Sequence, residues 1–470
     1  MRAHLLDLWD TLRSSYWFIP SVMAVLAVVL SFVTTAADGR LGPGWIDQVP
    51  WLYANKPDGA RTLLSTVAGS MIGVAGVTFS ITIASVVYAS GQYGPRLLSN
   101  FMRDTGNQVT LGTFIATFLY CLLVLRTIRA PDEGFGGENP SGDLVGPFVP
   151  HIAIAVGLAL ALASIAVFIY FIHHVPDSIH VSHVIAGVGR ELHKKVETAF
   201  PASFGEGAAD DNATGATDLP DSFFEEADRI EADGTGYVQG IDANALFDAA
   251  VEHDLVVRLR YRPGDFVTEG EAVALAWAPG RLGDDLAGTL RNAFVWGRTR
   301  TPLQDTGFLV NELVEIAARA LSPGVNDPFT AQSCLDWLGA ALKAIDGRNF
   351  PSEARYDDDG TLRLIARPTT YGDLVEAVFG QLRPYVAADR NAALHALKVL
   401  GEVAGQTEGD EARATLLRES EALADHAASV LTSPLDVEAV RARQRVVASV
   451  LAGRSYEALA AENVWLGGSA

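Results

Sequence analysis

Residues 62–95 read TLLSTVAGSMIGVAGVTFSITIASVVYASGQYGP and contain no Asp, Glu, Lys or Arg. A helix rises about 1.5 Å per residue, so this run is longer than the ~30 Å hydrocarbon core of a bilayer requires. It is also rich in glycine and in hydroxyl side chains, which contact with lipid alone does not need. The stretch therefore predicts a buried transmembrane helix against which other spans of the protein pack.

The first 176 residues hold further uncharged runs, at 14–37, at 105–125 and within 144–176. Asp7 and Asp10 precede the first of them, which is unlike a cleaved signal peptide, so we expect that run to be a retained span. The sequence thus predicts a multi-pass α-helical membrane domain of four spans over residues 1–176. Contact with the lipid bilayer follows directly from this prediction.

The distribution of basic residues predicts the orientation of these spans. Seven Lys and Arg residues fall in the segments on the side of the termini, and five fall in the loops on the other side. Cytoplasmic segments carry the excess of Lys and Arg. We therefore expect a bacterial inner-membrane protein with both termini in the cytoplasm.

Overall charge and cysteine content exclude several classes of protein. The net charge is −21, from 35 basic and 56 acidic residues. A nucleic-acid binder needs clustered Lys and Arg, so we expect no nucleic-acid partner. The two cysteines, Cys121 and Cys334, lie in a predicted span and in the distal part of the chain. We expect them to be buried as small hydrophobic residues, with no disulfide and no zinc site.

The chain after the spans predicts a mixed α/β, mainly helical, cytosolic domain. Apolar residues recur at helical spacing over 177–204, which predicts a juxtamembrane helix continuing from the fourth span. Residues 205–235 are acidic and poor in apolar side chains, so we expect a flexible linker. The final region, 281–470, predicts one β-hairpin around Asp359-Gly360 and a series of helices. The expected helices are 282–296, 306–321, 328–346, 371–387, 390–406, 411–431 and 435–451.

Between the linker and the helices, residues 236–280 alternate short strand-like runs with turns. This segment resembles the hammerhead of biotinyl- and lipoyl-like domains, and we expect a small β-rich subdomain. No lysine lies between Lys195 and Lys343, so the resemblance implies a structure and not a carrier of a modified lysine.

The first candidate site lies on the second span and comprises Thr66, Gly69, Ser70, Gly73, Gly76 and Ser80. One interpretation is close packing against other spans of the same chain, which glycines permit. The other is a face that lines a pore or joins subunits. No span carries a charged residue at its middle, which argues against proton- or sodium-coupled transport and leaves a passive channel open.

The second candidate is the end of the same helix at Gln92, Pro95 and Arg96. Pro95 predicts a helix stop and Arg96 suits a side chain that reaches the interface. The functional alternative is a hinge that couples the membrane domain to the cytosolic domain.

The third candidate is a polar loop with Ser322, Pro323, Asn326 and Asp327. Asp327 followed by Pro328 predicts a capped helix start, so a tight turn between two helices explains the segment. The alternative is a loop that binds a ligand or a protein partner in the cytosol.

His180 and His183 lie one helical turn apart and form a possible metal pair, but without nearby cysteines we expect no metal. The sequence contains no nucleophile elbow, Walker loop or dinucleotide fingerprint. We therefore expect neither an enzyme nor a cofactor.

Four segments together carry a family resemblance: TFSITI at 78–83, QYGPR at 92–96, LGTFIATFLY at 111–120 and RALSPGVNDPFTA at 319–331. The chain resembles the DUF2254 family of predicted bacterial membrane proteins, whose function is unknown. Gly94 stands where that family usually has serine. The resemblance implies a four-span inner-membrane protein with a cytosolic domain, and it implies no activity.

Two hypotheses about function remain open. The first is a homo-oligomeric passive channel or transport-related protein that is gated by its cytosolic domain. The second is a membrane-anchored sensor or scaffold without a pore, which binds a ligand or protein partner through residues 322–330.

Overall fold

A computed structural model describes residues 15–41, 56–94, 104–130, 148–199, 219, 223–277, 282–348, 350, 352–463 and 465–466. The chain forms two compact units, the first ending at His180 and the second beginning at Val181. Each unit has its own fold, and the two are described in turn.

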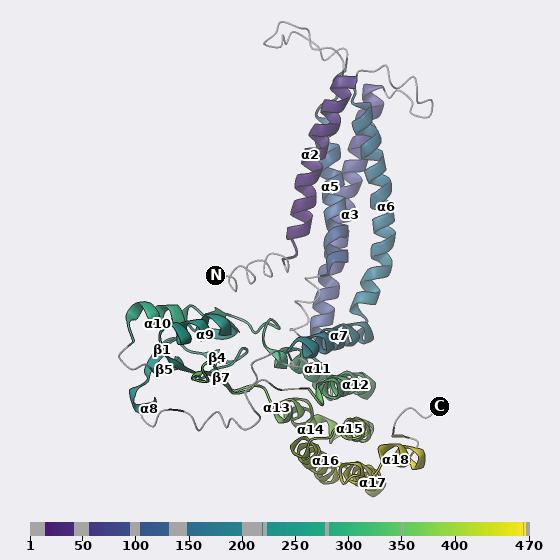
Figure 1. Ribbon diagram of the computed structural model, residues 1–470. Helices are drawn as coiled ribbons and strands as arrows, with labels where there is room; N and C mark the ends of the chain where they lie inside the picture. The colour runs from purple at the N-terminus through teal and green to yellow at the C-terminus, as the bar shows by residue number, and fades with distance from the viewer. Residues whose placement is uncertain are drawn as a thin grey trace. The chain divides into compact units, whose positions relative to one another are not determined.

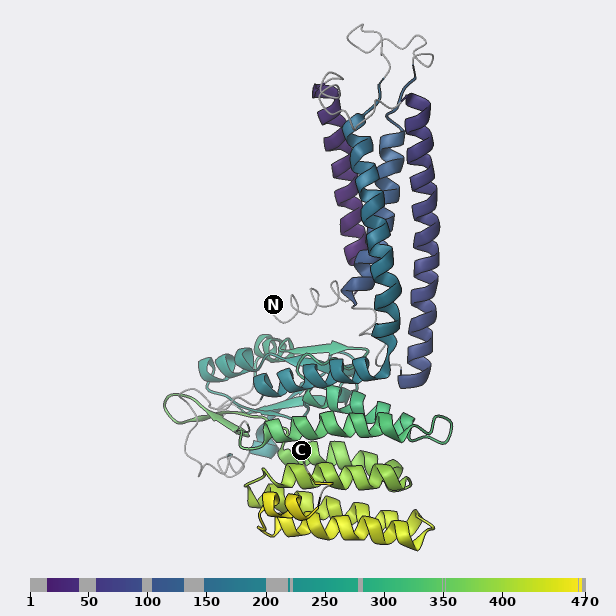
Figure 2. The same ribbon diagram turned by 90° about the vertical axis from the view of Figure 1, so that its right-hand side faces the viewer.

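The first unit is built from long apolar helices that run side by side (Figures 1 and 2). Among the described residues, four helices are long and apolar enough to cross a membrane, which confirms the four predicted spans. They are α2 (Phe18–Leu41), α3 (Pro57–Tyr93), α5 (Thr105–Leu125) and α6 (His151–Ile179).

The centre of this unit is α5, which packs against α2, α3 and α6. Half of its apolar window is buried, against 22% of the corresponding window of α3. The prediction that residues 62–95 form the buried central helix is therefore wrong. Gly112 helps α5 to take the central position. An added Cβ at this residue would lie 3.2 Å from the Cα of Pro20, so α2 approaches α5 closely there.

Hydroxyl groups join the helices inside the first unit. Thr34 Oγ1 lies 2.9 Å from Tyr120 Oη, and this phenol donates to the carbonyl of Ala153 at 3.0 Å. Thr117 Oγ1 of α5 lies 3.0 Å from Ser164 Oγ of α6. Such bonds between spans satisfy polar groups that lipid would leave without partners.

The last turn of α2 also caps α6. The two carboxylate oxygens of Asp38 accept hydrogen bonds from the backbone N–H groups of Ile152 and Ala153, both at 2.9 Å. Asp38 is buried, and a carboxylate at a helix N-terminus satisfies free N–H groups and faces the positive end of the helix dipole. It therefore ties two spans that are distant in sequence.

The second unit begins with α7 (Val181–Ala199). The prediction of one helix continuing from the fourth span is wrong, because His180 adopts an extended conformation (φ −68°, ψ 126°) between α6 and α7. The apolar periodicity that suggested continuity belongs to α7 alone. Its buried residues Ile185, Leu192 and Val196 form one face of this helix.

Two sheets form the β-rich part of the second unit. The five-stranded sheet has the order β1-β5-β3-β8-β7, with β3 and β8 parallel and its other neighbours antiparallel. The three-stranded sheet has the antiparallel order β4-β2-β6. The strands are β1 (Asp228–Glu231), β2 (Gly236–Ile241), β3 (Val256–Leu259), β4 (Phe266–Val267), β5 (Ala272–Trp277), β6 (Phe294–Gly297), β7 (Ala354–Tyr356) and β8 (Leu362–Ile365).

These sheets correct three predicted boundaries. The end of the expected linker folds as α8 (Phe223–Glu226) and β1, because Phe223 and Ile230 are fully buried in the core. The segment 236–280 is not a separate hammerhead-like subdomain, since its strands pair with β1, β6 and β8 outside it. The helix expected at 282–296 ends at Arg291, and β6 follows it.

The helices from α11 to α17 agree with the prediction to within a few residues, with α13, η4 and α14 together forming the helix expected at 371–387, whereas the prediction lacks α18. Helix α12 contacts α7, α11 and α15, and α15 contacts α16 and α17, so these helices lie in successive layers (Figures 1 and 2). The helices of the unit after α8 are α9 (Ala243–Glu252), α10 (Asp284–Arg291), α11 (Thr306–Ala320), α12 (Pro328–Ile345), α13 (Tyr371–Val375), the π-helix η4 (Glu376–Gly380), α14 (Gln381–Val386), α15 (Arg390–Ala404), α16 (Asp410–Val430), α17 (Pro434–Leu451) and α18 (Tyr456–Glu462).

Candidate functional sites

The small and hydroxyl residues of α3 form one exposed face. This small-residue stripe consists of Thr66, Gly69, Ser70, Gly73, Gly76 and Ser80, all of them exposed. A Cβ atom built on any of its three glycines would meet no described atom within 4 Å. The interpretation of these residues as packing against spans of the same chain is therefore wrong. The helix instead packs through Leu64, Ala68, Ala75, Thr78, Thr82 and Val86, which are buried.

The stripe lies opposite this buried face. At 3.6 residues per turn, each residue advances about 100° around the helix, which puts the middle of the stripe about half a turn from the middle of the buried set. Thr66, Gly69, Gly73, Gly76 and Ser80 are separated by alternating steps of three and four residues. That repeat keeps one face aligned with a neighbouring helix in a left-handed pair.

Two of the three hydroxyl groups of the stripe have partners within α3. Thr66 Oγ1 donates to the carbonyl of Thr62 at 2.7 Å, and Ser80 Oγ donates to the carbonyl of Gly76 at 2.9 Å. These bonds satisfy the hydroxyl protons and leave oxygen lone pairs on the outer surface. The stripe thus combines a surface that allows close approach with acceptor oxygens.

The predicted hinge is described only in part. Helix α3 ends at Tyr93, and Gly94 follows with φ 118° while its N–H bonds to the carbonyl of Ser90. The helix therefore stops before Pro95, as a proline predicts. Gln92 belongs to the last turn of α3, whereas Pro95 and Arg96 lie outside the described residues. The coupling role of this segment stays a prediction.

The loop between α11 and α12 is the tight turn that the sequence predicts. Asp327 accepts hydrogen bonds from the backbone N–H of Thr330 at 3.2 Å and from its hydroxyl at 2.6 Å, so it caps α12. Ser322 Oγ donates to the carbonyl of Arg319, and Asn326 has a positive φ of 51°. Pro323 and Asn326 are exposed. The role of this loop in binding a ligand or partner stays a prediction.

The His180–His183 pair and the two cysteines form no candidate metal centre among the described residues. Within the described parts of the chain, no three His, Cys, Asp or Glu side chains are placed to hold a metal ion. Cys121 and Cys334 are both fully buried, as predicted. Burial raises the pKa of the Cys334 thiol, and the nearby carboxylates of Asp327 and Asp336 raise it further.

The second unit contains a charged cleft that the sequence does not reveal. This arginine cleft, of about 410 Å³, is lined by charged side chains from three parts of the chain. Its charged residues are Arg262, Arg300, Arg355 and Arg367 with Asp265, Asp305 and Asp373. The segment Arg262–Asp265 contains a Pro-Gly pair, which is typical of a turn. Arg367 follows 105 residues later, and only the fold brings the two arginines into one cleft.

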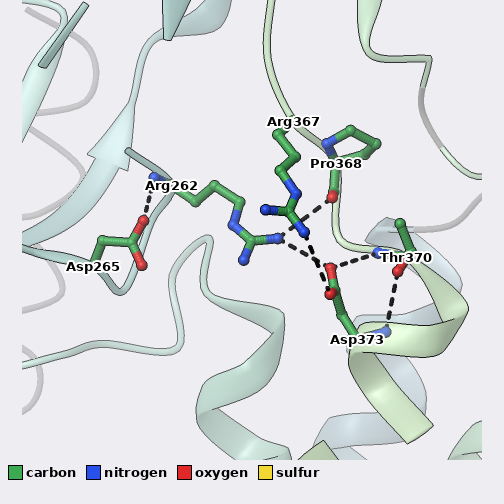
Figure 3. A network of polar contacts seen from close by, with 6 residues as sticks. All are labelled: Arg262, Asp265, Arg367, Pro368, Thr370 and Asp373. Carbon is green, nitrogen blue, oxygen red and sulfur yellow. Dashed lines mark hydrogen bonds and ion pairs between the residues drawn. The ribbon is translucent and has the colours of Figure 1, made fainter. Parts of the chain in front are cut away.

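One side of the arginine cleft is a network around Asp373 (Figure 3). Its Oδ2 accepts from Arg262 Nη1 at 3.2 Å, and its Oδ1 lies 3.9 Å from Arg367 Nη2. Arg262 Nη1 also reaches the carbonyl of Pro368 at 3.4 Å. Thr370 and Asp373 form a capping box at the start of α13, in which each side chain accepts the other residue's backbone N–H.

The other side of the arginine cleft is an ion pair between a half-buried arginine and a buried carboxylate. Asp305 Oδ2 accepts from Arg300 Nε at 2.9 Å and from Nη2 at 2.6 Å. Burial raises the pKa of Asp305, and the Arg300 guanidinium opposes this shift. Lys195 of α7 donates to the carbonyls of Pro302 and Leu303, so it holds the segment that carries this pair.

Four apolar helices followed by a unit of two sheets and layered helices define a multi-pass membrane protein with a large α/β unit after its spans. The family described as "Predicted membrane protein (DUF2254)" matches residues 13–402, and the chain belongs to this family. Proteins of Mycobacterium bovis and Mycobacterium tuberculosis, both described as uncharacterized, are 31% identical to it over 400 residues. That alignment covers 84% of this chain and 73% of each relative. No solved structure matches the chain.

Proposed function

We propose that the chain assembles through the small-residue stripe of α3 into a homo-oligomer, and that this oligomer is a passive channel in the bacterial inner membrane. The observation that carries this proposal is the position of the stripe. Its six residues lie on the exposed side of α3, opposite the face that packs within the chain.

Glycine and hydroxyl side chains contribute little to packing against lipid, whereas they allow another helix to pack closely. Glycines allow two helix backbones to approach, and hydroxyl oxygens accept hydrogen bonds across such a contact or from water in a pore. Residues 62–95 contain no charged side chain, so a path along α3 offers no relay for protons. The proposed activity is therefore passive transport, and we assign the chain no enzymatic reaction.

The proposed orientation places both termini and the second unit in the cytoplasm. The excess of basic residues, seven against five, supports this orientation. The second unit is then the gating domain. Its first helix, α7, follows α6 after the single extended residue His180, so the chain offers a short connection between the last span and this domain.

The second candidate function is a membrane-anchored sensor or scaffold that binds a protein partner through the loop before α12. The observation that favours it is apolar exposure at this turn. Phe329 is 72% exposed and Val325 is 42% exposed, although the polar groups of the loop are used in the turn itself. Exposed aromatic side chains are common anchors in protein interfaces.

Native mass spectrometry and ion flux from liposomes test the channel. The variant Gly73→Leu fills the middle of the stripe, and leucine is a better helix former than glycine by about 1 kcal/mol, so α3 itself is not weakened. Ile72→Leu is the matched control, because Ile72 is exposed on α3 outside the stripe and the substitution leaves the side-chain volume unchanged.

We expect the wild type and Ile72→Leu to form the same oligomer and to pass ions, and Gly73→Leu to lose both properties. A wild-type chain that stays monomeric contradicts the assembly. An oligomer that passes no ions, with Gly73→Leu changing only its size, contradicts the channel and leaves the sensor or scaffold as the function to test.

A further inference from the structure

We infer that the arginine cleft of the second unit is a binding site for a small, multiply charged anion that carries phosphate-type oxygens. The cleft gathers four guanidinium groups against three carboxylates, in a chain whose net charge is −21. This inference concerns the second unit alone, and it does not depend on whether the spans form a pore.

Two of the four arginines have donors to spare. Arg355, on β7, makes no ion pair or side-chain hydrogen bond with the part of the chain that the structure describes, and it is exposed. Arg367 is 70% exposed, and its contact with Asp373 is long, at 3.9 Å. A guanidinium carries five N–H donors in a planar fork that fits two oxygens of a phosphate at once.

The other two arginines are held in place by carboxylates. Asp305 fixes Arg300 through two hydrogen bonds, and Asp373 fixes Arg262 at 3.2 Å (Figure 3). These pairs largely neutralise one another. Arg355 and Arg367 are left without a close carboxylate partner, and with Asp265 the seven charged side chains of the cleft sum to +1. Two guanidinium groups with free donors favour a ligand that presents an oxygen to each of them.

The main chain of the cleft offers the ligand little. At the start of α13, the capping box uses the N–H groups of Thr370 and Asp373. The N–H of Arg262 is likewise taken by Asp265 Oδ2 at 2.7 Å. Recognition is then expected to come mainly from the arginine side chains, so removing one guanidinium weakens binding.

The size of the cleft agrees with this ligand class. About 410 Å³ is enough for a diphosphate and its first waters, and pockets for small molecules begin near 300 Å³. A phosphate-type group comes either from a free small anion or from the headgroup of an anionic lipid. The chemistry that the arginines recognise is the same in both cases.

Isothermal titration calorimetry of the full chain with pyrophosphate tests the site. We expect wild-type binding that weakens as salt is added, because the interaction is between charges. Arg355→Gln and Arg367→Gln are each expected to weaken binding tenfold or more. The matched control is Arg441→Gln, since Arg441 of α17 is 46% exposed, is paired with Asp425 at 3.4 Å and lies outside the cleft.

A second arm identifies the source of the anion. The chain is placed in nanodiscs of phosphatidylcholine with or without phosphatidic acid, and pyrophosphate is titrated into each. Competition by phosphatidic acid that disappears in Arg355→Gln assigns the cleft to a lipid headgroup, and unchanged pyrophosphate affinity assigns it to a free anion.

The melting temperature of each variant shows whether a loss of binding comes from the lost guanidinium or from unfolding. Arg355 and Arg367 are exposed, so their replacement is expected to leave the melting temperature without ligand unchanged. The inference is overturned if the folded wild type binds no pyrophosphate, or if Arg441→Gln weakens binding as much as the cleft variants do.

Discussion

Gly189 of α7 lies directly against the indole ring of Trp337 on α12, where a Cβ atom at residue 189 would stand 2.7 Å from Trp337 Cγ. Only a hydrogen atom at this position allows the two helices to pack as they do. We expect Gly189→Ala to lower the free energy of unfolding of the second unit by about 1–3 kcal/mol, the usual cost of overpacking. Denaturation followed by tryptophan fluorescence measures this change.

Gly187 provides the control for this prediction on the same helix. A Cβ atom at residue 187 would meet nothing within 4 Å. Because alanine favours a helix over glycine, Gly187→Ala is expected to leave stability unchanged or to raise it by up to ~1 kcal/mol. Equal effects of the two variants would contradict the role of Trp337.

Asp38 links α2 to the start of α6 by accepting two backbone hydrogen bonds. Asp38→Ala leaves both N–H groups without this partner, so we expect the first unit to lose about 1–2 kcal/mol, as for other lost helix caps. Thermal unfolding of the full chain in detergent measures the loss. Asp58→Ala is the control, because Asp58 is exposed in the first turn of α3, and a similar loss there would contradict the prediction.

Gly264 combines a positive φ of 97° with close approach to the Asp305 carboxylate, where an added Cβ would lie 2.7 Å from Cγ. We expect Gly264→Ala to displace Asp305 from Arg300 and to destabilise the second unit by about 2–5 kcal/mol, the sum of backbone strain and overpacking. Gly270, with φ 83° and open space around it, isolates the strain. Gly270→Ala should cost less, about 1–2 kcal/mol, in the same unfolding measurement.

The Asp373 carboxylate gives the second unit a pH-dependent contribution to stability. Burial alone would raise its pKa, but the N–H of Thr370 and the guanidinium of Arg262 hold the pKa below its usual value of 3.8. The ionised form therefore stabilises the folded state above pH 3.8, and this contribution is lost as the pH falls through the lower folded pKa.

The variant Asp373→Asn is expected to be less stable than the wild type at neutral pH and to lose less stability on acidification. Unfolding curves recorded at several pH values measure both effects. Asp248→Asn is the control, because Asp248 is an exposed carboxylate of α9. Parallel pH profiles for the wild type and Asp373→Asn would contradict the contribution of Asp373.

The predictable parts of this fold are those that depend on local sequence. The absence of charge predicts each span, and Asp327 with Pro328 predicts the start of α12, because these signals act within a few residues. The face on which α3 packs was not predictable in this way. Small residues are compatible with contact inside a chain or between chains, and the hydrophobic pattern of a span is similar on all sides.

The sheets and the arginine cleft depend on contacts between distant residues. Strand β8 pairs with β3, which lies more than 100 residues earlier in the chain. The domain boundary that composition predicts at residue 280 is therefore crossed by a sheet. Arg262 and Arg367 line one cleft for the same reason. In the sequence, each arginine looks like any charged surface residue. That these arginines share one cleft becomes visible only in the folded structure.

The internal hydrogen bonds of the stripe also bear on the order of events in biogenesis. Because Thr66 and Ser80 donate to carbonyls of their own helix, these two exposed hydroxyl protons already have acceptors in the single chain. Insertion into the bilayer therefore does not have to wait for a partner. In the assembly that we propose, the single chain inserts first and the subunits meet afterwards by lateral diffusion, so that the assembled fraction rises with the density of the protein in the membrane.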